Sequence, residues 1–224
     1  MTHRIWDLYS ELAARVRKSH EEAGLVGHHD WIHAFRVGEQ AMQIVMAEWG
    51  SVRNANLAGI AGLCHNADRI CQKTGSEDPS DLVREWIGAS LDYPSTNIIV
   101  DAVSKHSDVN DDDELEVAIA LKDADRVVNL DVDLFIRSGQ HYANLPAVDY
   151  RNMLDDPEAS YREPKSVLRD IAYSLDWVNP DSDVCIRTKE GMARGRRRAE
   201  VFQTFFEHLT AQLEEEGVHP YHFS

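Results

Sequence analysis

The chain has 224 residues, of which 43% are hydrophobic and 28% are charged, a composition that is ordinary for a folded globular protein. It carries 23 Lys and Arg against 39 Asp and Glu, which gives a formal net charge of −16. This excess repels nucleic acid and anionic membranes over most of the surface. It does not exclude a small phosphorylated ligand, because local Arg or Lys residues, or a metal, can reverse the potential inside one pocket.

The cysteine content and the N-terminal sequence bear on the compartment. Cys64, Cys71 and Cys185 form no C-x-x-C pair, and their number is odd, which favours a reduced, cytoplasmic protein. The N-terminus lacks the hydrophobic segment of a signal peptide, and no apolar run approaches about 18 residues. We therefore expect neither secretion nor a membrane span.

Hydrophobic residues recur at helical spacing through most of the chain. We expect helices at about 3–23, 30–48, 52–72, 79–90, 95–106, 113–130, 164–175 and 187–216. Ser51 is suited to cap the third, and Pro79 or Ser80 to begin the fourth. No stretch alternates apolar and polar residues long enough to demand a sheet. The sequence therefore predicts an all-α, single-domain helical bundle over 1–224, with residues 144–164 as either a lid over a site or a surface connection.

His33, His65 and Asp125 stand on three of the expected helices, and each shares a face with apolar residues. An uncompensated charge or imidazole is costly there, and a metal ion is the commonest partner that takes His and Asp together. Helical bundles are known to build metal sites from side chains on different helices. A single histidine on an apolar face is more often a hydrogen-bonded core residue, so spacing alone leaves the two interpretations about even.

Four short segments carry a resemblance to a known family. Residues 29–37 (HDWIHAFRV), 63–66 (LCHN) and 122–126 (KDADR) resemble, in order, the motifs of the HD-domain metal-dependent phosphohydrolase superfamily. Residues 105–107 (KHS) and the C-terminal helix are similar to those of its small bacterial members. The resemblance spans roughly residues 20–210. It implies a helical fold with core motifs at about 20–130, C-terminal helices at about 164–216, and one divalent ion held by His33, His65, Asn66 and Asp125.

The resemblance also implies an activity. Members of the superfamily hydrolyse phosphate esters or anhydrides, often of nucleotides, so we expect a phosphohydrolase in which a metal-activated water attacks phosphorus. Histidine and carboxylate ligands suit Mn, Co, Ni, Zn or Fe better than Mg. The expected partner is a small phosphorylated molecule, with a nucleotide favoured. A homodimer is a further option, and neither nucleic acid nor a membrane is expected as a partner.

Position 66 departs from the family, which has Asp where this chain has Asn66. A neutral carbonyl oxygen can coordinate a metal, but the lost charge should weaken affinity. Three interpretations stay open: an active natural variant, a natural variant without chemistry, or a substitution engineered to trap a ligand. The alternative function is a weakened or inactive ligand-binding or regulatory protein of the same fold. An iron oxygenase is a third class, disfavoured because Asn66 cannot easily bridge two cations.

Several other residues are candidates for the site. Asp68 is a candidate base or substitute ligand, and His106 a candidate general acid or phosphate ligand. Candidates for binding substrate phosphate are the cations beside the motifs, Arg36, Lys105 and Arg126.

Two of these candidates, and two further residues that could support the metal ligands, have a structural alternative. Arg126 would then form a surface salt bridge, and Lys105 would face solvent. Asp30 would cap a helix rather than support His33. Asp123 would be solvent-exposed rather than orient a ligand histidine.

Overall fold

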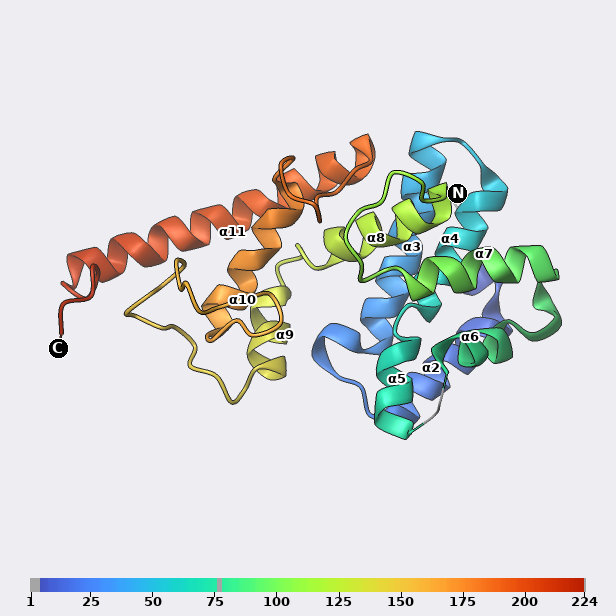
Figure 1. Cartoon of the computed structure of the whole chain (residues 1–224), viewed down its shortest axis with the longest axis horizontal. Helices are drawn as coiled ribbons and strands as arrows, with labels where there is room; N and C mark the ends of the chain where they lie inside the picture. Colours follow the sequence, from blue (N-terminus) through green and yellow to red (C-terminus); the bar gives the residue numbers. More distant parts are fainter. Residues whose placement is uncertain (1–4, 76–77, 224) are drawn as a thin grey trace.

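The computed structural model describes residues 5–75 and 78–223, and its regular elements are helices (Figure 1). Within these residues there is no β-strand, apart from an isolated antiparallel bridge between Ser160 and Glu163. The predicted all-α fold class is therefore confirmed. None of the described helices combines the length and the apolar character that crossing a membrane requires.

The first part of the chain forms what we call the N-terminal bundle. Its helices are α1 (Ile5–Leu8), α2 (Ser10–Ala23), α3 (Trp31–Glu48), α4 (Val52–Cys64), α5 (Ala67–Thr74), α6 (Pro79–Ile87), α7 (Tyr93–Ser104) and α8 (Glu116–Val128). The rest forms the C-terminal arm, with α9 (Leu134–His141), α10 (Val167–Tyr173) and α11 (Lys189–Glu215). Short 3-10 turns cover Gly27–His29, Gly88–Ser90 and Ser174–Val178. In Figure 1 the long α11 extends away from the bundle.

Side-chain caps fix where several helices begin. Asp30 accepts a hydrogen bond from the backbone N–H of His33 at 2.7 Å, and Ser51 accepts one from Asn54 at 3.2 Å. Both residues satisfy a backbone donor that the first helical turn leaves free. The predicted cap at Ser51 is confirmed, and Asp30 has the capping role. Helix α6 begins at Pro79, as the sequence predicted.

The structure corrects the sequence prediction in three places. The helix expected at 52–72 is interrupted after Cys64, and His65 and Asn66 form the turn between α4 and α5. The helix expected at about 3–23 begins outside the described residues and is divided at Tyr9, between α1 and α2. Helix α9 was not predicted at all. The other predicted helices are present with ends shifted by a few residues.

Helices α3 and α4 approach backbone to backbone. A Cβ atom added to Gly62 would lie 2.6 Å from the Cα of Gly38, and one added to Gly38 would lie 2.8 Å from the carbonyl oxygen of Gly59. Neither contact is sterically allowed, so glycine is needed for this packing. The close approach brings His33 on α3 near His65 at the end of α4.

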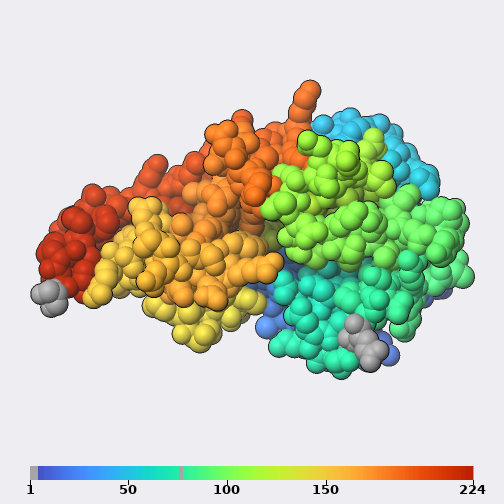
Figure 2. All heavy atoms as spheres, viewed as in Figure 1, coloured from blue at the N-terminus to red at the C-terminus, as the bar shows by residue number. Residues whose placement is uncertain are grey.

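The apolar core is divided between the bundle and the arm. The largest cluster fills the N-terminal bundle, a second surrounds Phe202 and Phe206 of α11, and a third packs Val127 of α8 against Trp177 and Ile186. This third cluster joins the arm to the bundle. In the space-filling view the yellow and orange surface of the arm lies directly against the bundle (Figure 2).

The long segment between α9 and α10 packs inward at its C-terminal end. The ring of Tyr161 lies 6.3 Å from that of Tyr173 and 6.4 Å from that of Trp177, between centroids. Burial raises the pKa of the Tyr161 hydroxyl, and the carboxylates of Asp125 and Asp170 raise it further. Tyr161 keeps 58% of its surface exposed, so the segment packs only partly against the arm at this point.

Candidate metal centre

Three side chains from three helices converge in the N-terminal bundle. One potential ligand atom from each of His33, His65 and Asp125 lies within 4.8 Å of the other two. His33 Nε2 is 3.0 Å and His65 Nε2 is 3.9 Å from Asp125 Oδ1. Both histidines are 2% exposed, whereas 24% of the Asp125 side chain is accessible. Two imidazoles and a carboxylate are a donor set that divalent transition metals accept in proteins, often with further coordination positions left open.

The orientation of the two imidazoles fits such an ion. His65 donates from Nδ1 to the carbonyl oxygen of Gly62 at 2.7 Å, so the lone pair of Nε2 is turned toward Asp125. His33 donates from Nε2 to Asp125, and its buried Nδ1 has no hydrogen-bond partner in the described part of the chain. A metal-ligating imidazole must be deprotonated at the ligating nitrogen, so a cation would take the place of the proton that His33 now shares with Asp125.

The carboxyl group of Asp125 is held ionised. Burial acts to raise its pKa, but the hydrogen bond from His33 and the electrostatic interaction with the imidazoles of His65 and His33 hold the pKa well below its usual range. Asn129, one turn further along α8, donates from Nδ2 to Asp125 Oδ1 at 3.0 Å. This bond fixes the rotamer of the carboxylate in the manner of an outer partner of a metal ligand.

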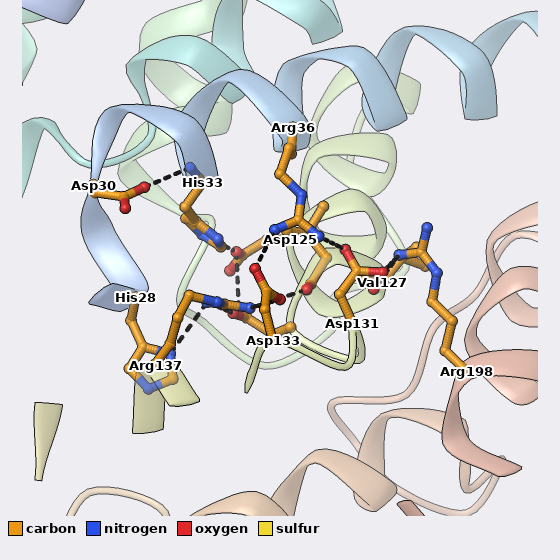
Figure 3. A network of polar contacts seen from close by, with 12 residues as sticks. His28, Asp30, His33, Arg36, Asp125, Val127, Asp131, Asp133, Arg137 and Arg198 are labelled. Carbon is orange, nitrogen blue, oxygen red and sulfur yellow. Dashed lines mark hydrogen bonds and ion pairs between the residues drawn. The ribbon is translucent and has the colours of Figure 1, made fainter. Parts of the chain in front are cut away.

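Helix α9 of the C-terminal arm contributes Arg137 to this arrangement (Figure 3). Arg137 is buried and donates from Nη1 to Asn129 Oδ1 at 3.2 Å, so a chain of hydrogen bonds runs from Arg137 through Asn129 to Asp125. The guanidinium also lies 3.4 Å from Asp133 and 3.5 Å from Nδ1 of His28. Through these contacts α9 helps to position the Asp125 carboxylate.

Asn66 is 1% exposed and bonds to neighbours of the cluster. Its Oδ1 accepts a hydrogen bond from His29 Nδ1 at 3.2 Å, and its Nδ2 contacts His20 Nε2 and the carbonyl oxygen of His29, both at 3.4 Å. His20 donates from Nδ1 to the carbonyl of Val16 at 2.9 Å, so its Nε2 is an acceptor. Two acceptors therefore face the amide nitrogen, and the surroundings match asparagine rather than aspartate.

More histidines line the edge of the cluster toward the arm. The ring of His141 on α9 lies 5.2 Å from that of His28 and 5.9 Å from that of His29, between centroids. Burial, followed by the charges of His33 and Arg69, lowers the pKa of His29 to about 2. Burial and the charge of Arg69 also lower the pKa of His141. These imidazoles are neutral at pH 7, and Arg69 is the nearby cation that they share.

Two of the predicted phosphate-binding cations have other partners. Arg36, one turn along α3 from His33, pairs with Asp131 and lies 2.6 Å from Asp133 (Figure 3). Lys105 is exposed and pairs with Asp101 at 2.8 Å. The Arg36 pairs join α3 to the segment before α9, and the Lys105 pair stays within the last turn of α7.

Arg126 and Asp123 of α8 are both buried, contrary to the surface positions considered for them. Arg126 donates from Nη1 to Asn110 Oδ1 at 2.8 Å and to the carbonyl of Cys185 at 2.9 Å. Asp123 accepts the backbone N–H of Thr188 at 2.8 Å, just before α11 begins. Both residues thus fasten loops to α8, and Asp123 does not orient a ligand histidine.

Asp68 and His106 lie beside His65, on the side facing α6 and α7. They help to line a cavity of about 240 Å³ whose wall includes His65 itself. The ring centroid of His106 is 5.4 Å from that of His65. Asp68 follows the break between α4 and α5, so it does not continue the face of α4 that carries His65. It is not part of the three-residue cluster.

Sequence reasoning missed several residues around the cluster. Asn129 stands four residues after Asp125 on α8, so helical spacing could have identified it. Arg137 and His141 have the same spacing on α9, but that helix itself was not predicted.

The fold and the cluster together define an all-α protein with a two-histidine, one-aspartate centre. No protein-family model matches the sequence, and no curated protein matches it. The structure is similar to the crystal structure of a protein from Lactobacillus plantarum, a Northeast Structural Genomics target, with a TM-score of 0.67. The two sequences are 14% identical, and the alignment covers 92% of this chain and 97% of that one. At this identity the likeness concerns the fold alone.

Proposed function

We propose that the chain is a divalent-metal-dependent phosphohydrolase of the HD-domain type, acting on a small phosphorylated molecule such as a nucleotide. The observation that carries the proposal is the convergence of His33, His65 and Asp125 within 4.8 Å, each from a different helix. The expected ion is Mn, Co, Ni, Zn or Fe rather than Mg, because imidazole nitrogen supplies two of the three donors. When bound, such an ion acidifies a water molecule and polarises a phosphoryl oxygen.

Residues around the centre have separate tasks in this proposal. His33, His65 and Asp125 hold the ion, and Asn129 with Arg137 keeps the carboxylate in place. Two further side chains, Arg69 and His106, would act on the substrate.

Arg69 is the phosphate-binding candidate, because it is half-exposed and its charge acts on His29 and His141. His106 donates from Nδ1 to the carbonyl of Val103 at 2.7 Å, so its Nε2 is free to accept a proton from the attacking water and then to pass it to the leaving oxygen. Arg36 and Arg126 each bond to two protein partners, and Lys105 lies 2.8 Å from Asp101, so these three residues take no part in this assignment. The contact of Arg69 with Asp68 is longer, at 3.5 Å.

The second candidate function is ligand binding without turnover, and the observation that favours it is the bonding of Asn66. The oxygen and the nitrogen of its amide contact His29 and His20, so the side chain bonds to residues outside the three-residue cluster. As an amide it also adds no negative charge to the centre. A centre with one carboxylate binds a divalent cation less tightly than a centre with two. The protein could then recognise a phosphorylated ligand and release it unchanged.

Phosphate release separates the two candidates. The purified protein is incubated with nucleoside mono-, di- and triphosphates and each of the divalent ions, with and without chelator. The matched variants are His65→Ala and His208→Ala, since His208 is an exposed residue of α11. The proposal expects release that chelator and His65→Ala abolish and that His208→Ala leaves unchanged. Bound nucleotide without release under every condition supports the second candidate, and release that is indifferent to chelator contradicts the metal mechanism.

A further inference from the structure

The cavity beside His65 is formed by elements other than those that supply the rest of the cluster. Asp68 comes from α5, valines from α6 and α7, and His106 and Ser107 from the turn after α7. In Figure 2 the teal and green surface over these helices faces the viewer. Because His65 belongs to both the cavity wall and the proposed metal centre, a molecule in the cavity adjoins the reacting phosphate.

The charge of the cavity wall is unlike that of a phosphate site. Its residues include one carboxylate, Asp68, and neither lysine nor arginine. One oxygen of that carboxylate, Oδ1, is buried and has no hydrogen-bond partner within the described residues. The other lies 3.5 Å from Arg69 Nε. A buried oxygen without a donor is costly unless a ligand supplies one, and a negatively charged ligand would be repelled.

The remaining polar groups of the cavity are mostly acceptors or hydroxyls. His106 uses Nδ1 to donate to the carbonyl of Val103, so Nε2 is an acceptor. Ser80, Ser104 and Ser107 contribute hydroxyl groups, and Ser104 already donates its proton to the carbonyl of Asp101 at 2.9 Å. Such a wall selects a ligand that is neutral and rich in hydrogen-bond donors.

The apolar part of the wall and the size of the cavity further restrict the chemical class of the ligand. The side chains of Val83, Val100 and Val103 provide a surface for carbon atoms. The volume of about 240 Å³ is below the range of about 300–1,000 Å³ that is usual for drug-sized ligands. A pentose fits these requirements, whereas a second phosphate group does not.

Resting on the proposed function, we infer that this cavity binds the sugar of the substrate, with Asp68 accepting hydrogen bonds from its hydroxyl groups. The phosphate then lies at the cluster of His33, His65 and Asp125, which adjoins the cavity through His65. In a nucleotide bound in this way, water adds to phosphorus, the bond between phosphorus and the sugar oxygen breaks, and the nucleoside leaves once that oxygen has taken up a proton. The substrate class is therefore a sugar phosphate or nucleoside monophosphate with free hydroxyl groups.

A pair of nucleosides that differ only in hydroxyl groups tests the inference without any need for turnover. Adenosine and 2′,3′-dideoxyadenosine are titrated calorimetrically into the protein. We expect adenosine to bind at least about tenfold more tightly, because each hydroxyl donates to a carboxylate or an imidazole. Asp68→Asn should remove most of this preference. Asp81→Asn, which changes an exposed carboxylate of α6, should retain it. Equal binding of the two nucleosides by the unaltered protein would overturn the inference, whatever the variants do.

Hydrolysis rates provide a second test of the sugar site. The ratio of kcat/KM for AMP to that for 2′,3′-dideoxy-AMP should exceed about ten and fall toward one in Asp68→Asn, chiefly through KM. If Asp68 were instead a catalytic base, kcat would fall alike for both substrates and the ratio would persist, which contradicts the inference. Absence of phosphate release together with a preserved adenosine preference would refute the hydrolase but retain the sugar site.

Discussion

Replacing Asn66 with aspartate would create an adjacent His-Asp pair, as in the HD superfamily, yet the structure predicts that it destabilises the metal-free protein. The amide nitrogen of Asn66 faces His20 Nε2 and the carbonyl oxygen of His29, each 3.4 Å away. An aspartate oxygen in its place would set three acceptors against one another. His20 cannot reverse its role while neutral, because its Nδ1 proton is used on Val16.

The magnitude follows from the burial of the position. Asn66 is 1% exposed, and a buried acceptor that lacks a donor costs about 1–3 kcal/mol. Both contacts are long, so we expect Asn66→Asp to lower the free energy of unfolding by about 2 kcal/mol at pH 8. The loss should be smaller at pH 6. Burial lowers the pKa of His20 in the protein as it stands, but a carboxylate at 66 would favour its protonation and accept its Nε2 proton.

Urea unfolding in the presence of chelator measures this loss, with Asn144→Asp as the control because Asn144 is exposed. The same variant should bind a divalent ion more tightly than the unaltered protein, since it gains a negative charge beside the candidate ligands. Equal stability of Asn66→Asp and the unaltered protein at pH 8 would refute the reasoning that the pocket is matched to an amide.

Three other results are expected. Asn129→Ala should weaken metal affinity about 10–100-fold by calorimetry without changing the circular dichroism spectrum, because it frees the Asp125 carboxylate; unchanged affinity would contradict this. Gly62→Ala should lower the free energy of unfolding, measured with urea, by about 1–3 kcal/mol, because its Cβ would lie 2.6 Å from the backbone of α3. A variant as stable as the unaltered protein would contradict this close approach of α3 and α4. Metal-free protein should lose stability as pH falls from about 6.5 toward 3. Burial, with the charge of Arg137 at His28, holds the pKa values of His28 and His65 at about 3 in the folded state, so the unfolded chain takes up their protons first. Below about pH 6.5 each of the two histidines lowers the free energy of unfolding by about 1.4 kcal/mol per pH unit. Urea midpoints that do not change from pH 8 to 5 would contradict this pH dependence.

The sequence predicted the helices best where local signals were strong. The caps at Asp30 and Ser51 and the apolar periodicity located α3 and the start of α4. The sequence could not show that His65 and Asn66 leave the helix, because apolar residues continue at helical spacing across them, at Leu63, Ala67 and Ile70. The turn is stabilised by contacts distant in sequence, such as the bond between Asn66 and His29. Helix α9 is short, and its packing against the arm and the turn before α3 provides much of its stability.

The candidate site likewise has a part that the sequence predicted and a part that it did not. The spacing of His33, His65 and Asp125 on apolar faces was enough to propose a shared partner, because helix geometry fixes which residues share a face. The roles of the arginines depended on tertiary contacts. Arg126 is buried by partners 16 and 59 residues away, and no local pattern reports such contacts.

Metal content at equilibrium tests the central claim most directly. The protein and its His33→Ala, His65→Ala and Asp125→Ala variants are stripped with chelator, dialysed against Mn, Co, Ni, Zn or Fe(II), and analysed by mass spectrometry for metal per chain. We predict close to one ion per chain for the unaltered protein with at least one of these metals, and much less metal per chain in each of the three variants. An unaltered protein that retains no ion, or variants that retain as much as it does, would contradict the account.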